Sequence, residues 1–389
     1  MSEVFVAVPN PIVFVSFVGV DLHKETVTLC ACNPAGEFLS SLTISTKCVL
    51  KIEQWLAALP RPCRLAVETV GFVEWFIDRF RSCVDKIEIA DATELANCRG
   101  KRRKTDRNDA RDVAVRLARG DCPLGYIADE PLMQLRKLGR HWRQLSRTLS
   151  RAKHCMSSML LAANLRGPKL DGSSAQKWLL TNSDLLKPVQ REAFGNFLDI
   201  ICLIERQREP LRRRIIFANR DEKFAALTTI LKSVPGIDEI WACIIAAEIG
   251  PFDRFPNADA LEFWAGMTAD LKESAGRTQS GPITKAGSAT LRWAICKAAL
   301  CLCRSDERQE QIRQRLMRRI GRPKANVAVG RRLLRILFAM VRDGTFYQGQ
   351  KPTGHERKAN RVRLKRKSNK QSKVVKEIIN LQDKELVLA

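Results

Sequence analysis

The feature that most constrains the fold is the order of apolar segments between residues 12 and 90. Three segments, 12–20, 26–32 and 37–46, are apolar or alternate with a period of two, which is typical of strands. Turn-forming residues separate them, so an antiparallel meander is predicted. An amphipathic helix, a short buried strand, a helix and another strand then follow, at 47–59, 64–69, 73–80 and 86–90. The sequence therefore predicts an α/β domain over residues 12–122.

Four acidic residues lie at the ends of elements that this order would bring to one edge of the sheet. Asp21 ends the first strand, and Glu68 lies inside an apolar strand, where a carboxylate costs several kcal/mol unless it is paired or metal-bound. Asp106 and Asp109 are three residues apart in the first turn of a helix that we expect to run from the N-cap Thr105 to Arg119. The order matches the ribonuclease-H-like layout, in which acids at these places meet at one edge of the sheet.

Converging carboxylates favour a metal site. Their mutual repulsion is tolerable mainly when divalent cations neutralise it, and an oxygen-only ligand set without cysteine or histidine favours Mg²⁺ or Mn²⁺ over zinc. Two such ions about 3.5–4 Å apart would clamp the attacking and leaving oxygens of a phosphodiester. The basic run 101–104 is expected to meet phosphates, whereas Asp112 is interpreted as a solvent or salt-bridge residue. The alternative is that these are scattered surface acids, two of which compensate a helix dipole.

The charge balance points to a polyanionic partner. Lys and Arg number 67 against 42 acidic residues, a formal charge of +25, and nucleic acid is the first candidate. No apolar run is long enough to span a bilayer, and the apolar segment through Val20 lacks the basic lead-in of a signal peptide. The thirteen cysteines and four histidines show no zinc-ligand spacing. We therefore expect a reduced cytoplasmic protein, associated with the nucleoid and not with a membrane.

Residues 123–225 are predicted to be helical. Apolar residues from Leu135 to Met159 alternate at spacings of three and four, which favours a coiled coil with basic outer faces. Residues 169–186 are expected to be an irregular connector, and Pro210 is expected to kink or split the second helical stretch. Two antiparallel arms and an arm that dimerises are both compatible with this periodicity.

Residues 226–345 are predicted to form a further helical domain. A Pro-Gly turn at 235–236 lies between two helices and is similar to a helix-hairpin-helix motif, although Asp238 replaces the usual second glycine. A purely structural hairpin is equally compatible. The Ser-, Gly- and Thr-rich stretch 268–282 is expected to be a mobile loop, and residues 304–343 to form basic helices. The basic tail, 346–389, is expected to be disordered or ordered by RNA.

Three motifs resemble those of the insertion-sequence 110 transposases, the bridge-RNA-guided recombinases with a RuvC-like DEDD domain. They are Val-Gly-Val-Asp21-Leu-His-Lys, Val-Glu68-Thr-Val-Gly and Lys104-Thr-Asp106-Arg-Asn-Asp109-Ala. The resemblance extends to the Pro-Gly-Ile hairpin, a serine-glycine loop and the Thr284-Lys285-Ala-Gly287 turn. It implies that the four acids bind the metals and that a distant serine attacks the phosphate, forming a covalent phosphoserine link to DNA.

The family's serine falls on Ser274 when it is counted back from Thr284-Lys285. Ser280 is the competing assignment and Ser288 a more distant one. The resemblance also implies DNA as donor and target and a structured guide RNA. We further expect a homo-oligomer, a dimer or tetramer, whose active sites assemble between subunits.

The leading hypothesis is thus a DNA transposase or recombinase. A ribonuclease-H-like nuclease or junction resolvase, in which water attacks and no serine is needed, is the second hypothesis. The third is a non-enzymatic nucleic-acid scaffold, which would leave Glu68 in its apolar strand without an explanation.

Overall fold

The computed structural model describes residues 12–99, 105–218, 221–274 and 277–349. The chain divides into two compact units, with unit 1 ending at Ala128 and unit 2 beginning at Asp129. Unit 2 contains both the helical middle and the C-terminal region, so a domain boundary near 225 stays a prediction. Within the described ranges, no helix has the length and apolar character needed to cross a membrane.

Unit 1 is built on a six-stranded sheet with the order β3-β2-β1-β4-β5-β6. The predicted meander is confirmed, since β1 pairs antiparallel with β2 and β2 with β3, whereas β1–β4 and β4–β5 are parallel. The short strand β6 pairs antiparallel with β5 at one edge of the sheet. The strands are β1 (Ser16–Leu22), β2 (Thr26–Cys32), β3 (Phe38–Ser45), β4 (Cys63–Glu68), β5 (Lys86–Ala90) and β6 (Leu124–Gly125).

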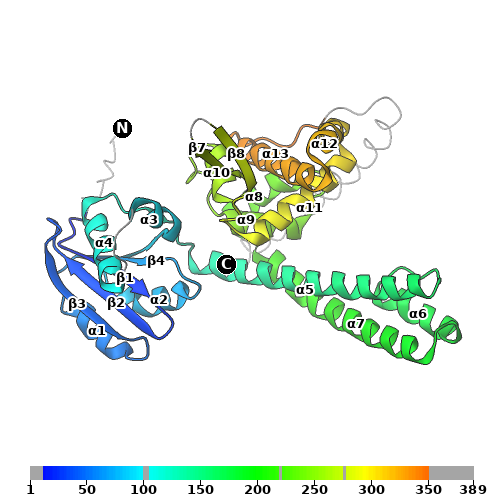
Figure 1. The fold of residues 1–389 in the computed structure, drawn as a ribbon, viewed down its shortest axis with the longest axis horizontal. Coiled ribbons are helices and arrows are strands. Elements are labelled where there is room, and N and C mark those ends of the chain that lie inside the picture. The colour runs from blue at the N-terminus through cyan, green and yellow to red at the C-terminus, as the bar shows by residue number, and fades with distance from the viewer. Residues whose placement is uncertain (1–11, 100–104, 219–220, 275–276, 350–389) are drawn as a thin grey trace, which may run out of the picture. The chain divides into compact units, whose positions relative to one another are not determined.

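Helices cover both faces of this sheet, giving three layers (Figure 1). One face buries Val18 and Val20 against α1 and α2, and the opposite face buries Phe17 against α4. The alternation of β1 side chains thus sends residues 17, 19 and 21 toward α4. The helices are α1 (Val49–Ala57), α2 (Val73–Phe80), the single turn η1 (Arg81–Cys83), α3 (Ala92–Arg99) and α4 (Asp106–Arg119).

Unit 2 begins with a long helical hairpin, which Figure 1 shows in green. Its helices α5 (Glu130–Ala162) and α7 (Pro188–Phe217) run antiparallel, because Leu149 and Met156 pack near Phe194, while Leu135 packs near Ile215. Of the two arrangements left open by the sequence, the structure thus has two antiparallel arms within one chain.

One prediction for this hairpin is wrong, and another is settled only in part. The connector contains α6 (Gly172–Asn182) and the turn η2 (Ser183–Leu185); the carboxylate of Asp171 caps α6 by accepting from the Ser174 amide at 2.8 Å. Helix α7 is continuous through Pro210, so it is not split there, and a kink at this residue stays a prediction. Pro210 and Arg206, whose carbonyl loses its amide partner, are both exposed, so water can replace that bond.

The rest of unit 2 is a helical body with the largest apolar core of the described chain. Helix α9 is buried along most of its length and pairs with α8 across the Pro-Gly turn. Gly236 adopts a φ of +94°, and a Cβ there would lie 2.3 Å from Cys301 Cβ. The helices are α8 (Glu222–Lys232), α9 (Glu239–Ile249), α10 (Ala258–Trp264), α11 (Ala289–Ser305), α12 (Glu307–Ile320) and α13 (Arg322–Arg342).

The predicted helix–turn–helix around residue 235 is present, and its departure from the usual motif has a local reason. The carboxylate of Asp238 is the N-cap of α9 and accepts from the Trp241 amide at 3.0 Å. That amide is therefore occupied within the chain. Phosphate binding by this turn stays a prediction.

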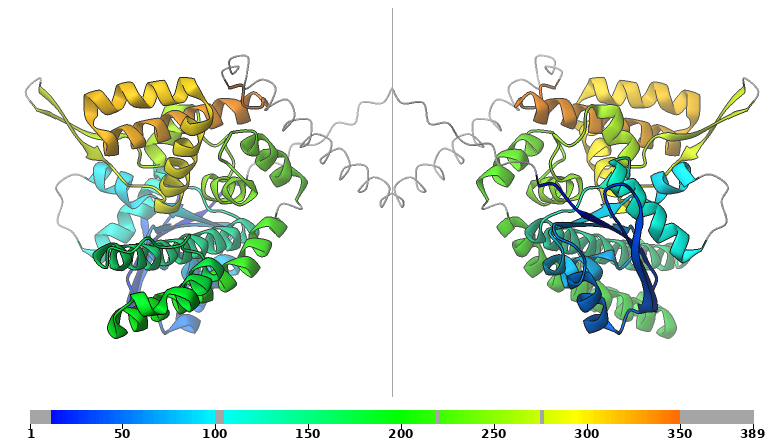
Figure 2. Two further views of the ribbon diagram at one scale, coloured as in Figure 1. Left: turned by 90° about the vertical axis from the view of Figure 1, so that its right-hand side faces the viewer. Right: turned by 90° about the vertical axis from the view of Figure 1, so that its left-hand side faces the viewer.

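The prediction of a loop at 268–282 is wrong, because most of this stretch forms two strands. Strands β7 (Ala269–Ser274) and β8 (Arg277–Ile283) pair antiparallel and project from the helices of unit 2 (Figure 2). Asp270, Gly281 and Pro282 are exposed. A two-stranded hairpin outside the core needs no apolar alternation, which is why the polar composition gave no strand signal.

Candidate metal centre

The candidate centre lies at the carboxyl end of β1 and β4. The parallel register pairs Val20 with Val67, so the next residues, Asp21 and Glu68, come side by side where the two strands end. Both follow the alternation onto the face covered by α4. Asp21 is 8% exposed and Glu68 is half-buried. The predicted convergence of the first and fourth strands is therefore present.

A glycine brings α4 against this part of the sheet. A Cβ on Gly19 would lie 2.0 Å from the Ala110 carbonyl oxygen and 2.4 Å from the Ala114 amide nitrogen. Only a residue without a side chain allows the helix backbone to approach β1 this closely. Because Gly19 is two residues before Asp21, the contact fixes the first turn of α4 beside the Asp21 carboxylate.

The first turn of α4 has the predicted geometry. The Thr105 hydroxyl accepts from the Asn108 amide at 3.3 Å, and the helix runs from Asp106 to Arg119. Asp109 is buried and Asp106 exposed. One turn further on, the Asp112 carboxylate accepts from Arg116 Nε at 3.0 Å, which confirms its interpretation as a salt-bridge residue. The basic run 101–104 lies outside the described residues.

Electrostatics show that the four acids converge. Burial raises the pKa of Asp21, the charge of His23 opposes that rise, and the carboxylates of Asp106, Glu68 and Asp109 add to it. Each of the three therefore lies close enough to Asp21 to repel its ionised form. This repulsion is relieved when a cation binds among the carboxylates or when one of them is protonated.

A histidine that the predicted ligand set did not include lies beside the cluster. His23 Nε2 lies 3.4 Å from Asp21 Oδ2 and 3.7 Å from Asp106 Oδ1. Potential ligand atoms of Asp21, His23 and Asp106 all lie within 4.8 Å of one another. The signal was available: His23 follows Asp21 by two residues, and its amide continues the ladder by donating to the Thr26 carbonyl at 2.9 Å.

The donor set fits a hard divalent cation. Carboxylate oxygens of Asp21 and Asp106 lie together at a partly buried edge, with one imidazole available as a further ligand or as an orienting partner, and the charges of Glu68 and Asp109 act on Asp21 there. Such a site can bring phosphate oxygens to a cation and lower the charge that opposes nucleophilic attack. The arrangement is thus suited to phosphodiester chemistry.

The serine candidates lie in unit 2. Ser274 is the last residue of β7, paired with Arg277, and Ser280 in β8 pairs with Leu271. The Ser288 hydroxyl caps α11 by accepting from the Thr290 and Leu291 amides, both at 3.2 Å. Ser288 therefore has a structural role that accounts for its position.

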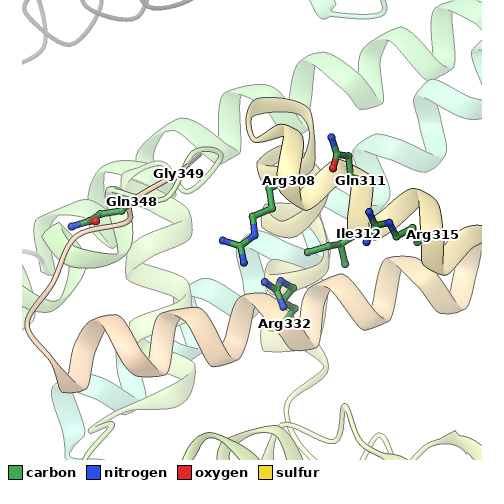
Figure 3. Close-up of a pocket in the computed structure, with 7 residues that line it drawn as sticks. All are labelled: Arg308, Gln311, Ile312, Arg315, Arg332, Gln348 and Gly349. Carbon is green, nitrogen blue, oxygen red and sulfur yellow. The ribbon is translucent and has the colours of Figure 1, made fainter. Parts of the chain in front are cut away.

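Unit 2 also has a pocket lined by basic side chains. Arg308 and Arg315 of α12 and Arg332 of α13 line a pocket of about 700 Å³, with their guanidinium groups directed into it (Figure 3). Arg332 is held by a 3.0 Å hydrogen bond from its Nε to the side chain of Gln309, which is buried. No carboxylate lines the pocket among the described residues. Of the predicted basic tail, residues 350–389 lie outside the described residues.

Two family models match the chain over separate segments. One, for the DEDD transposases of IS110 and described as "Transposase", matches residues 18–164. The other, described as "Transposase IS116/IS110/IS902 family", matches residues 228–314. The first contains all four acids of the cluster and the second contains the β7–β8 hairpin.

Two curated proteins are similar to parts of the chain. The "Insertion element IS110 uncharacterized 43.6 kDa protein" of Streptomyces coelicolor is 30% identical over 132 residues, 33% of this chain and 32% of its own length. The "Putative transposase y4qE" of Sinorhizobium fredii is 24% identical over 200 residues, 51% of this chain and 48% of its own. The chain therefore spans about half, or less, of the length of these relatives.

Proposed function

Because the chain belongs to the IS110 family of transposases, we propose that it cuts and rejoins DNA as the transposase of an insertion sequence. The observation that carries the proposal is the convergence of Asp21, Glu68, Asp106 and Asp109 at one sheet edge. Unit 1 on this proposal is a ribonuclease-H-like, RuvC-like domain. The strand order 3-2-1-4-5 with two antiparallel and two parallel pairs supports that assignment.

The four acids hold divalent cations, Mg²⁺ or Mn²⁺, in this proposal. Bound cations would supply charge neutralisation and Lewis acidity at the scissile phosphate. Asp21 and Asp106 would be two of the ligands, and His23 would orient them through its contacts with both carboxylates. Glu68 and Asp109 complete the set from β4 and the inner face of α4.

Ser274 supplies the nucleophile. Its hydroxyl oxygen forms a bond to phosphorus, the bond from phosphorus to a deoxyribose oxygen breaks, and the serine proton passes to a neighbouring base. The phosphoserine link keeps the energy of the phosphodiester, so the strand can be rejoined to a new partner. The match of 228–314 to a transposase model and the count back from Thr284-Lys285 support this residue.

We further propose that a structured guide RNA selects the donor and target DNA by base pairing with them. The formal charge of +25 and the basic pocket of Figure 3 are suited to nucleic-acid backbones. The active protein is a homo-oligomer in which the acids of one subunit serve the serine of another. The α5–α7 hairpin, as a coiled coil, is the proposed contact between subunits.

The test uses full-length protein with its co-purified RNA and end-labelled DNA that carries the element's ends. Denaturing gels should show Mg²⁺- or Mn²⁺-dependent cleavage and a protein–DNA adduct that Ser274→Ala abolishes and Ser280→Ala retains. Mixing Ser274→Ala subunits with Asp21→Ala subunits should restore activity if sites are shared between subunits.

Three outcomes would count against parts of the proposal. Cleavage that survives both serine substitutions without an adduct would mean hydrolysis by water, as in a junction resolvase. Loss of the adduct in Ser280→Ala alone would move the nucleophile. Cleavage and joining by protein stripped of RNA would show that no guide RNA is needed.

A further inference from the structure

A groove between α5 and α11, here called the α5–α11 groove, has a volume of about 460 Å³. Arg147, Arg151 and His154 line it from α5, and Trp293 and Lys297 line it from α11. The α5 residues are spaced by four and three positions, which places them on one face of the helix. No carboxylate lines the groove among the described residues.

The charges in the groove are not compensated within the described part of the chain. Neighbouring cations of α5 have acidic partners: Arg140 pairs with Glu248 at 3.0 Å and Lys153 with Glu205 at 3.1 Å. None of the ion pairs found among the described residues involves Arg147, Arg151 or Lys297. Along the same helix, some cations are thus neutralised by ion pairs, whereas Arg147 and Arg151 are exposed together.

Two arginines beside the groove show the resulting repulsion. The Nε atom of Arg143, one turn before Arg147, is buried without a hydrogen-bond partner among the described residues. Burial and then the charge of Arg147 lower the pKa of Arg143, and burial and then Arg143 lower the pKa of Arg292. A fold that keeps these cations together gains stability when an anion binds near them.

An aromatic side chain gives the groove a second kind of contact. Trp293 is half-buried and packs on Trp241 with ring centroids 4.7 Å apart, so its ring is held in one place at the groove. Rigid aromatic rings beside cations are the contacts that single-stranded nucleic acids use, because every base can stack while the phosphates meet the charges. The Arg308–Arg332 pocket has arginines but no aromatic lining residue.

We propose that the α5–α11 groove binds a single-stranded nucleic-acid segment, with its phosphates held by Arg147, Arg151 and Lys297 and a base stacked on Trp293. The inference rests on the proposed function, since strand exchange and guide pairing both produce unpaired strands. The volume suits one or two nucleotides and not the width of a duplex. The strand could be RNA or displaced DNA, which share this chemistry.

The first test measures binding of labelled 12-nucleotide oligo-uridine RNA, oligo-thymidine DNA and a duplex DNA of equal length by fluorescence anisotropy. Full-length protein freed of RNA is compared with the triple variant Arg147→Gln, Arg151→Gln, Lys297→Gln. The matched control removes the same charge from exposed positions of α6 and α7 with Lys177→Gln, Arg206→Gln and Arg212→Gln.

The groove variant should bind single strands on the order of tenfold more weakly, with the salt slope reduced by about 0.7 for each lost phosphate contact. The control variant should change affinity much less. Equal losses in both variants, or an equal loss for duplex DNA, would overturn the proposal in favour of a general charge effect. Stronger binding of RNA than of DNA, or the reverse, identifies the strand.

Substitutions of Trp293 test the stacking contact separately. Trp293→Leu should weaken single-strand binding by roughly tenfold with an unchanged salt slope, and Trp293→Phe should restore most of it. If the Trp293→Leu protein has the melting temperature of the wild type and binds single strands equally well, Trp293 does not stack on a base. If Trp293→Leu fails to fold, the charge variants still test binding in the groove, and quenching of tryptophan fluorescence by the bound strand, compared between wild type and Trp293→Phe, tests the base contact.

These measurements separate the two proposals. Asp106→Asn should keep single-strand binding while it loses cleavage. If no variant or wild-type protein cleaves DNA but the groove still binds, only the proposed function fails. If cleavage and guided joining are normal in groove variants that no longer bind single strands, the groove proposal fails alone.

Discussion

Buried carboxylates occur in both units, and their surroundings are opposite. In unit 2, Glu248 is 2% exposed and accepts from Arg140 through both oxygens, at 3.0 and 3.2 Å. Glu262 is fully buried, and its Oε2 accepts from Arg331 at 2.8 Å and from Arg335 at 3.2 Å. In unit 1, Asp21 faces three other carboxylates and one histidine.

The buried carboxylates of unit 2 stabilise the fold by pairing with arginines. The carboxylates of unit 1 repel one another, and the rest of the fold keeps them close together. An arginine-paired glutamate joins elements, α5 to α9 in one case and α10 to α13 in the other. The acids of unit 1 destabilise one another, and strand register, the Gly19 contact and the Thr105 cap keep them in place. Removing a charge should therefore have opposite consequences in the two units.

The largest effect is expected from Asp106→Asn, which keeps the side-chain shape but weakens a proposed metal ligand. Cleavage should fall by roughly 10²–10³-fold or more, the range for losing one electrostatic contact in a reacting centre. The matched control is Asp112→Asn on the same helix, whose carboxylate pairs with Arg116. It should stay within a few fold of the wild type. Similar losses in both variants would contradict the assignment of the site.

The local parts of this site could be predicted from the sequence. Thr105, Asp106 and Asp109 depend on capping and helical spacing within five residues, and the structure agrees on cap and helix bounds. Asp21 and Glu68 could be placed because the order of strands determines which ends meet. His23 had a local signal, its position two residues after Asp21, but its contact with Asp106, far along the chain, could not be predicted from that spacing.

The parts that failed have a common physical cause. The sequence of the β7–β8 hairpin has no apolar alternation, and the apolar stripe of helix α6 (Ala175, Trp178 and Leu179) spans little more than one turn, so neither gave the long periodicity on which the predictions depended. The distinction between paired and clustered buried acids also requires the tertiary structure. Glu248 and Glu262 gave no signal in the sequence, because their arginines are 108 and 69 residues away.

Gly19→Ala tests whether backbone contact assembles the cluster. Its Cβ would meet the Ala110 carbonyl oxygen and the Ala114 amide nitrogen, so α4 must move away from β1. We expect a loss of about 3 kcal/mol in the free energy of unfolding and a weaker thermal stabilisation by Mn²⁺. Gly71→Ala, where nothing lies within 4 Å of the new Cβ, is the control. Equal stability of the two variants would mean that α4 reaches Asp21 by another route.

Glu262→Gln tests the other side of the comparison. Arg331 and Arg335 would lose their shared carboxylate; because their side chains are 38% and 46% exposed, water screens part of the cost. We expect unfolding in urea to show a loss of about 2 kcal/mol, with nucleic-acid cleavage retained at temperatures where the variant is folded. Glu209→Gln, at the exposed pair with Arg213, should cost less than about 0.5 kcal/mol. A stable Glu262→Gln protein would show that the pairing is dispensable.

The smallest effect has the opposite sign and distinguishes the two classes most directly. Burial, followed by the neighbouring carboxylates, raises the pKa of Asp21, so its ionised form destabilises the metal-free fold. Asp21→Asn should raise the metal-free melting temperature by roughly 2 °C, while abolishing stabilisation by Mn²⁺. Because the folded pKa lies above the unfolded value, the penalty is absent below the unfolded pKa and appears as pH rises through the folded pKa. The difference between variant and wild type should therefore vanish in acid and grow toward neutral pH. A wild type that is more stable than Asp21→Asn at neutral pH without metal would place Asp21 with Glu248 and Glu262, as a carboxylate that stabilises its unit.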